Sequence, residues 1–128
     1  MQIIVCDDIR RTQLRQGRWA GYFVDNRDFG IGHEANSRWP IDVYVTFSPN
    51  GREFSADGTD EIGTFKFTHG TISDECFCQF LKTYETHSVT YQGLIYGHLI
   101  SGMWWLTDHP WISGTFSMYP HWQTLASM

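Results

Sequence analysis

The stretch PIDVYVTFSPNGREFSA, residues 40–56, decides the fold of this chain. In its first half an apolar residue stands at every second position from Ile41 to Phe47, and this period of two is typical of a β-strand with one buried face. Ser48-Pro49-Asn50-Gly51 then combines a proline, where a fixed φ is favoured, with an Asn-Gly pair that tolerates positive φ. The chain must therefore turn back at once into a second strand, Arg52–Ala56, which makes an antiparallel hairpin.

Segments of the same composition, each closed by a Gly, Asn, Asp, Pro or Ser turn, fill the chain from Gly17 to Tyr119. No apolar segment has the length and 3.6-residue period of a core helix. We therefore predict an all-β fold, an eight-stranded antiparallel up-and-down barrel in which sequence neighbours pair. We expect Asp108-His109-Pro110 to interrupt the pairing before the last strand. The predicted strands are Trp19–Val24, Pro40–Phe47, Arg52–Ala56, Gly63–His69, Cys76–Tyr84, Ser88–Tyr96, His98–Leu106 and Gly114–Tyr119.

The length of 128 residues fits one β-barrel domain, residues 1–128, with its barrel core at about 17–119. Aromatic residues make up 16% of the chain, which is a good supply for one core. Met1–Cys6 can form a short extra strand, and Asp7–Gln16 can form a helical turn. The long polar segment Asp25–Ser37 is expected to be a loop that covers the mouth of the barrel.

The charge balance disfavours a nucleic-acid partner, because 9 Lys and Arg stand against 14 Asp and Glu for a net charge of −5. Basic residues cluster only before the first strand. We interpret this cluster as a solvated lead-in, with an anion contact as the alternative. Its members are Arg10, Arg11, Arg15 and Arg18.

Neither a membrane-spanning helix nor a secretory segment is expected, since no apolar run reaches 18 residues and acidic residues interrupt the early one. The odd number of cysteines, Cys6, Cys76 and Cys78, also speaks against a disulfide framework. Cys76 and Cys78 suit two small residues on one strand face better than half of a zinc site. We expect a cytoplasmic protein without a membrane partner or a metal.

Short Gly-aromatic motifs give the chain a family likeness. Trp19-Ala20-Gly21-Tyr22, Trp39-Pro40, Asp57–Phe65, Ile100–Trp104 and Gly114-Thr115-Phe116 stand in the order seen in small barrels. In this layout the chain resembles lipocalin-like and avidin-like barrels of the calycin type. The resemblance implies a barrel with an apolar pocket. It carries over no substrate, because no biotin-binding set of polar residues can be matched position by position.

A small apolar ligand in the barrel lumen is the function that this reading favours. His98 would serve as a polar anchor beside aromatic walls. The alternative is that the same rings fill the interior, so that the barrel is a protein-interaction or assembly module with no ligand. The candidate lumen residues are Tyr22, Tyr44, Phe65, Tyr91, His98, Trp104 and Phe116.

The acidic segment Asp57–Gly63 offers carboxylates that could hold calcium, but a turn whose aspartates bond their own backbone N–H groups needs the same residues. We favour the turn, and expect Asp60 to pair with Arg18 or Arg38. The six histidines are scattered without metal-ligand spacing, and no nucleophile elbow or phosphate loop is present. We therefore predict no catalytic residues, no cofactor and no metal, and an enzyme with a lumenal acid-base pair is the weakest of the three functional classes.

The strand His98–Leu106 is apolar on both faces. Trp104 and Trp105 are consecutive, so their side chains point to opposite faces, and Leu99 and Met103 share the face of Trp105. We expect a second subunit to cover this outer face, making a homodimer or higher homo-oligomer; cover by the chain ends, Met1–Ile9 or His121–Met128, is the alternative. In the assembly reading, Trp111, Tyr119 and Trp122 extend the contact.

Overall fold

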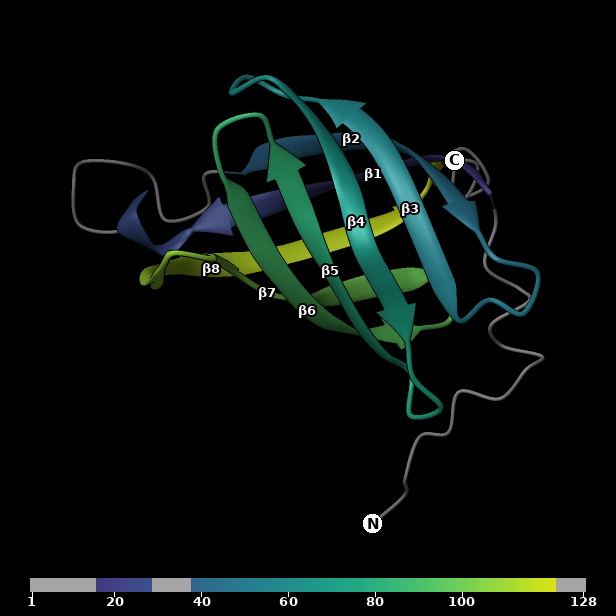
Figure 1. Cartoon of the computed structure of the whole chain (residues 1–128). Coiled ribbons are helices and arrows are strands. Elements are labelled where there is room, and N and C mark those ends of the chain that lie inside the picture. Colours follow the sequence, from purple (N-terminus) through teal and green to yellow (C-terminus); the bar gives the residue numbers. More distant parts are fainter. Residues whose placement is uncertain (1–15, 29–37, 122–128) are drawn as a thin grey trace, which may run out of the picture.

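The computed structural model describes residues 16–28 and 38–121 and shows an all-β molecule (Figure 1). The predictions for Met1–Cys6, for nearly all of Asp7–Gln16 with Arg10, Arg11 and Arg15, for most of the Asp25–Ser37 loop and for Trp122 lie outside the described residues. Within the described ranges, no helix has the length and hydropathy needed to cross a membrane. The elements are β1 (Gly17–Asp25), the 3-10 helix η1 (Asn26–Asp28), β2 (Trp39–Phe47), β3 (Glu53–Thr59), β4 (Thr64–Ile72), β5 (Phe77–Tyr84), β6 (Ser88–Tyr96), β7 (Leu99–Leu106) and β8 (His109–Pro120).

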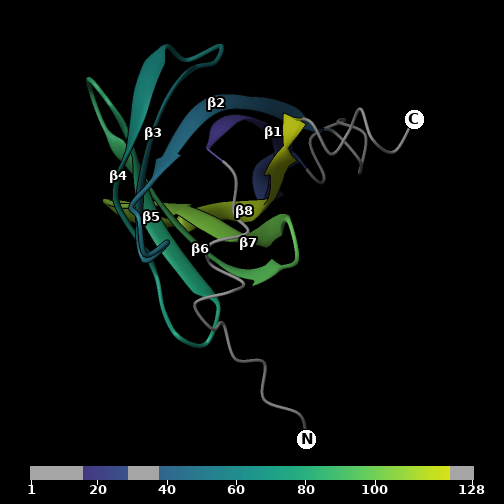
Figure 2. The same ribbon diagram turned by 90° about the vertical axis from the view of Figure 1, so that its right-hand side faces the viewer.

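The eight strands form one closed barrel in sequence order, which confirms the predicted fold class. Every neighbouring pair is antiparallel, and β1 pairs with both β2 and β8, with Phe23 opposite Trp39 on one side and Phe116 on the other. Figure 2 shows β1 between β2 and β8, where the sheet closes. A closed sheet leaves no edge strand in the barrel.

Glycine allows the barrel to close tightly between β1 and β8. A Cβ atom built on Gly114 would lie 1.7 Å from the carbonyl oxygen of Val24, which is far closer than two such atoms can approach. The same carbonyl accepts a hydrogen bond of 3.0 Å from Nε1 of Trp104. The missing side chain at Gly114 therefore lets the two backbones and the indole of Trp104 meet at one point.

Several strand bounds differ from the sequence-based expectation, and β3 in particular extends to Thr59, into the acidic segment Asp57–Gly63 that was predicted as a turn. The predicted interruption at Asp108-His109-Pro110 is confirmed in part: β8 begins at His109, which pairs with Leu106, but the register then shifts, and the regular ladder with β7 starts at Ser113, opposite Trp105. Strand β4 continues to Ile72, although its register with β5 shifts between Thr68 and Thr71. In both places the backbone bends locally and the ladder resumes, which sequence composition alone does not reveal.

Aromatic side chains fill the middle of the barrel. The ring of Phe80 on β5 lies 5.4 Å from that of Phe54 on β3 and 4.4 Å from that of Phe67 on β4. It also lies 4.9 Å from Tyr91 on β6 and 6.0 Å from Phe116 on β8, measured between ring centroids. Rings from four other strands thus meet around Phe80, so this layer of the lumen is packed core.

Candidate functional site

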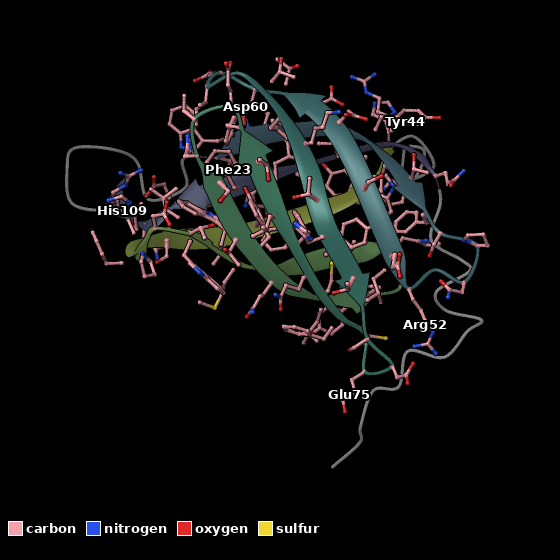
Figure 3. The ribbon with its side chains drawn as sticks, viewed as in Figure 1. Phe23, Tyr44, Arg52, Asp60, Glu75 and His109 are labelled. Atoms are coloured by element: carbon pink, nitrogen blue, oxygen red, sulfur yellow. The ribbon has the colours of Figure 1, made fainter. Side chains whose placement is uncertain are left out.

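One end of the barrel, which we call the mouth, carries the chain connections β1–β2, β3–β4, β5–β6 and β7–β8. A pocket of about 750 Å3 lies there. Figure 3 shows Phe23 and Asp60 at this end and Arg52 and Glu75 at the other. The pocket is lined by Phe23, Asp25, Arg27, Trp39, Pro40, Asp42, Thr59, Asp60, Glu61 and Ile62.

The apolar wall of the pocket comes from the mouth ends of β1 and β2 and from the β3–β4 turn. Phe23 and Trp39 pair across β1 and β2, and their rings are nearly parallel, 22° apart in plane and 6.4 Å between centroids. Trp104 packs edge-on against Phe23 at 5.9 Å from the inner side. Ile62 lies in the β3–β4 turn and is 63% exposed. The pocket thus has flat aromatic walls and an aliphatic residue at its rim.

The β3–β4 turn places the carboxylate of Asp60 over the inner face of β5. Oδ1 of Asp60 accepts a hydrogen bond of 2.9 Å from the backbone N–H of Ile62, so the carboxylate supports its own turn, as the sequence predicts. Oδ2 accepts hydrogen bonds from Nζ of Lys82, at 2.7 Å, and from the hydroxyl of Tyr84. The partner of Asp60 is therefore Lys82, and the expected pairing with Arg18 or Arg38 is wrong.

Lys82 is a lysine in the interior of the barrel, with only 3% of its side chain exposed. Its ammonium lies 4.4 Å from the ring centre of Phe65, 5.1 Å from that of Phe23 and 5.2 Å from that of Tyr84. Such distances are within the range of cation–π attraction. Three rings and one carboxylate therefore surround this nitrogen, directly behind the pocket residues Phe23 and Asp60.

Burial and pairing act in opposite directions on these two charges. Burial lowers the pKa of Lys82, and the hydrogen bond and charge of Asp60 oppose that effect only in part. Burial also acts to raise the pKa of Asp60, but the hydrogen bonds from Lys82 and Tyr84 outweigh it and hold that pKa below its usual value. Burial, followed by the neighbouring Asp60 carboxylate, raises the pKa of Tyr84. The tyrosine therefore stays protonated and remains a donor to Asp60.

Two other pocket carboxylates, Asp25 and Asp42, carry ion pairs of their own. Oδ2 of Asp25 lies 2.6 Å from a guanidinium nitrogen of Arg27, which lines the same pocket. Asp42 makes a two-pronged pair with Arg18, with contacts of 2.9 and 2.6 Å. Hydrogen bonding by Arg18 lowers the pKa of Asp42. The three aspartates of the pocket lining are thus each matched by a cation, and Glu61 is the fourth carboxylate of the lining.

The structure separates the seven predicted lumen residues into three groups. Phe65, Tyr91, Trp104 and Phe116 are buried, with Phe65 and Trp104 near the mouth and the other two in the packed middle layer. The other two groups, Tyr22 with Tyr44 and His98 by itself, contradict the sequence-based expectation.

Tyr22 and Tyr44 are on the outer face of the barrel. Tyr44 is 61% exposed and alternates with the buried Val43 and Val45, while Tyr22 is stacked against the guanidinium of Arg38, 4.3 Å from the ring centre. His98 lies in the turn between β6 and β7, at the end opposite the mouth. None of the seven predicted lumen residues is among the residues that line the mouth pocket.

Sequence reasoning missed Lys82, Phe23 and Trp39 as site residues, although a signal for Lys82 was present. Cys78, Phe80, Lys82 and Tyr84 occupy alternate positions of β5, and all four are buried. A period-two reading carried through this strand would have placed Lys82 inside the barrel. An inward lysine needs a carboxylate partner, and the position of that partner follows only from the closed sheet.

The described residues contain no group of three or more His, Cys, Asp and Glu side chains that could hold a metal ion. Cys76 and Cys78 are both buried free cysteines, as expected of small core residues. Burial raises the pKa of the Cys78 thiol, which keeps it in the protonated and unreactive form.

Comparison with known proteins adds no family to this description. No protein-family model matches the sequence, and no curated protein matches it. The fold and the pocket define the molecule as a small closed β-barrel with a polar-aromatic mouth.

Proposed function

We propose that this protein binds a small, largely apolar molecule in the mouth pocket. The observation that carries the proposal is a pocket of about 750 Å3 with Phe23, Trp39, Pro40 and Ile62 in its wall. Pockets for small molecules combine a concave apolar lining of this size with a few polar groups. Since the middle of the barrel is filled by rings, the ligand lies at the mouth and does not reach through the lumen.

The shape of the pocket favours a ligand with a flat apolar part. The nearly parallel rings of Phe23 and Trp39 form a smooth wall, on which an aromatic or polyene group packs well. Asp60 and the Asp25–Arg27 pair supply fixed polar contacts at the edge of this wall. Such groups orient a ligand more than they add affinity.

Binding can be tested with the neutral fluorophore N-phenyl-1-naphthylamine, whose emission rises in an apolar environment. Wild-type protein should give a saturable rise, and Ile62→Glu should weaken binding about tenfold, because an apolar contact of about 1.4 kcal/mol is lost. Tyr44→Glu is the matched control, since Tyr44 is similarly exposed, at 61%, but lies on the outer face of β2 and outside the pocket lining. An absence of saturable binding, or equal weakening by both variants, would refute the proposal.

We further propose that the barrel belongs with the lipocalin-like and avidin-like barrels of the calycin type, and that it acts in the cytoplasm. The sequential eight-stranded topology supports the first statement. The second rests on the odd number of cysteines, Cys6, Cys76 and Cys78, which does not suit the disulfide framework of a secreted domain.

A second candidate function is self-association through the outer face of β5, β6 and β7. Large apolar side chains gather there: Leu94 is 39% exposed, Tyr96 51% and Met103 57%. Phe77 pairs with Leu94, and Tyr96 pairs with Leu99, so these side chains are neighbours on one surface. A contiguous apolar face of this kind is typical of an interaction site.

Sedimentation velocity tests this candidate. Wild-type protein should form a dimer that Met103→Glu converts to a monomer, whereas Thr46→Glu, an exposed position on the outer face of β2, should leave the dimer intact. A wild-type monomer at all concentrations would exclude self-association through this face.

A further inference from the structure

We propose that the amine of Lys82 captures an aldehyde or ketone group of the bound ligand as a reversible imine. The inference deepens the proposed function and rests on it, because it assigns a reactive group to the ligand of the mouth pocket. It requires that Nζ can reach the pocket, that it can lose its proton, and that the proton transfers of imine formation have a partner within reach.

The position of Lys82 meets the first requirement. Its side chain points to the inner face of β5 at the level of the mouth, and its Nζ is 5.1 Å from the ring centre of Phe23, a wall residue of the pocket. Asp60, another pocket residue, lies between the pocket and this nitrogen and contacts it at 2.7 Å. Nζ is therefore in direct contact with one lining residue of the pocket, and imine formation requires that the Asp60 side chain shifts aside when a ligand enters.

The surroundings of Nζ meet the second requirement. The aromatic rings of Phe23, Phe65 and Tyr84 attract the ammonium, but they also exclude water from the nitrogen, and this burial lowers the pKa of Lys82 despite the opposing effect of Asp60. Lysines that form imines in proteins are commonly activated in such apolar sites. A lysine in an exposed ion pair, such as Lys66, is not enclosed in this way.

Asp60 meets the third requirement as proton acceptor and donor. The ammonium of Lys82 passes a proton to Oδ2 of Asp60, and the neutral nitrogen attacks the carbonyl carbon of the ligand. A C–N bond forms, a nitrogen proton moves to the carbonyl oxygen, and a carbinolamine results. Asp60 then returns its proton to the hydroxyl group, water leaves, and a protonated imine remains beside the carboxylate. The step consumes no oxidant or reductant, and hydrolysis reverses it.

The chain offers a built-in control, because Lys66 and Lys82 are its only lysines. Lys66 is on β4 with 71% of its side chain exposed, and it lies 3.8 Å from the equally exposed Asp57. It therefore reports the reactivity of an ordinary surface amine in the same molecule and in the same sample.

The test incubates the full chain with 2-naphthaldehyde and sodium cyanoborohydride, which reduces an imine to a stable secondary amine, and locates the product by peptide mass mapping. We expect the adduct on Lys82 to form about tenfold faster than on Lys66, because the pocket holds the aldehyde beside the amine. Lys82→Arg keeps a cation beside Asp60 and should abolish the fast adduct. Lys66→Arg should leave it unchanged.

Labelling of Lys66 at the same rate as Lys82, or a fast adduct that persists in Lys82→Arg, would overturn the imine proposal. Titration of the same samples with N-phenyl-1-naphthylamine separates the two proposals. Saturable binding of this neutral probe without a fast Lys82 adduct would reject the imine and leave the pocket in place. Loss of both signals in wild-type protein would reject the proposed function itself.

Discussion

Replacing Asp60 by Asn is the sharpest test of the buried pair at the barrel mouth. The side chains of Lys82 and Asp60 are only 3% and 11% exposed, so the variant leaves a buried ammonium without its counter-charge. Removing one partner of a buried pair is costly for this reason. Lys82 can escape the cost only by releasing its proton.

Proton release by Lys82 sets an upper bound on the part of the stability loss that comes from the uncompensated charge. At pH 7 the solution lies 3.5 units below the ordinary lysine pKa of 10.5, which corresponds to about 4.8 kcal/mol at 1.36 kcal/mol per unit. The amide oxygen of Asn can still accept a hydrogen bond, so we expect Asp60→Asn to lower the free energy of unfolding by about 2–4 kcal/mol at pH 7. At pH 9.5 the same bound falls to about 1.4 kcal/mol.

Urea unfolding followed by tryptophan fluorescence measures this difference between wild type and variant at both pH values. The double variant Lys82→Met with Asp60→Asn carries neither charge and should regain more than half of the lost stability. Asp57→Asn removes an exposed pair with Lys66 and should change stability by less than about 0.5 kcal/mol. A destabilisation by Asp60→Asn that is equal at pH 7 and pH 9.5 would show that buried charge is not its cause.

Three further predictions concern the core, the closure of the barrel and acid stability. Phe80→Ala should destabilise the protein by about 3–5 kcal/mol in urea unfolding, because it opens a cavity among four contacting rings; a loss below about 1 kcal/mol would mean that the lumen is not packed there. Gly114→Ala should cost at least about 1–3 kcal/mol in the same assay, since its Cβ would meet the carbonyl of Val24 at 1.7 Å, and an unchanged midpoint would contradict the close approach of β1 and β8. The pKa of Asp60 is lower in the folded than in the unfolded chain, so its contribution to the free energy of unfolding is complete above about pH 3.8 and is lost as the pH falls from there through the folded pKa. The free energies of unfolding of wild type and Asp60→Asn should therefore converge in this acidic range. A difference that stays constant with pH would refute the lowered pKa of Asp60.

The sequence predicted the barrel well because its signals are local. The hairpin of β2 and β3 follows from alternation and from the Ser48-Pro49-Asn50-Gly51 turn, in which the backbone N–H of Gly51 indeed bonds to the carbonyl of Ser48. Strand β6 has the predicted bounds, Ser88–Tyr96. Such features depend on a few consecutive residues, so they need no knowledge of the rest of the chain.

The candidate site was predicted poorly because aromatic character was given more weight than strand parity. Tyr44 alternates with Val43 and Val45, so the same pattern that identified its strand already placed it outside. Lys82 shares the inner parity of Phe80, yet a lysine in the core conflicts with its usual preference for water. Only a specific carboxylate partner resolves that conflict.

By itself, the sequence determined the strands, their order and which side of most strands faces inward, since period-two patterning and turn chemistry act over short distances. Tertiary structure alone decided that Asp60 meets Lys82, 22 residues further along the chain, and that rings fill the middle of the barrel while the mouth stays open. The physical reason is that the register and closure of the sheet bring together side chains whose separation in sequence carries no information about their distance in space.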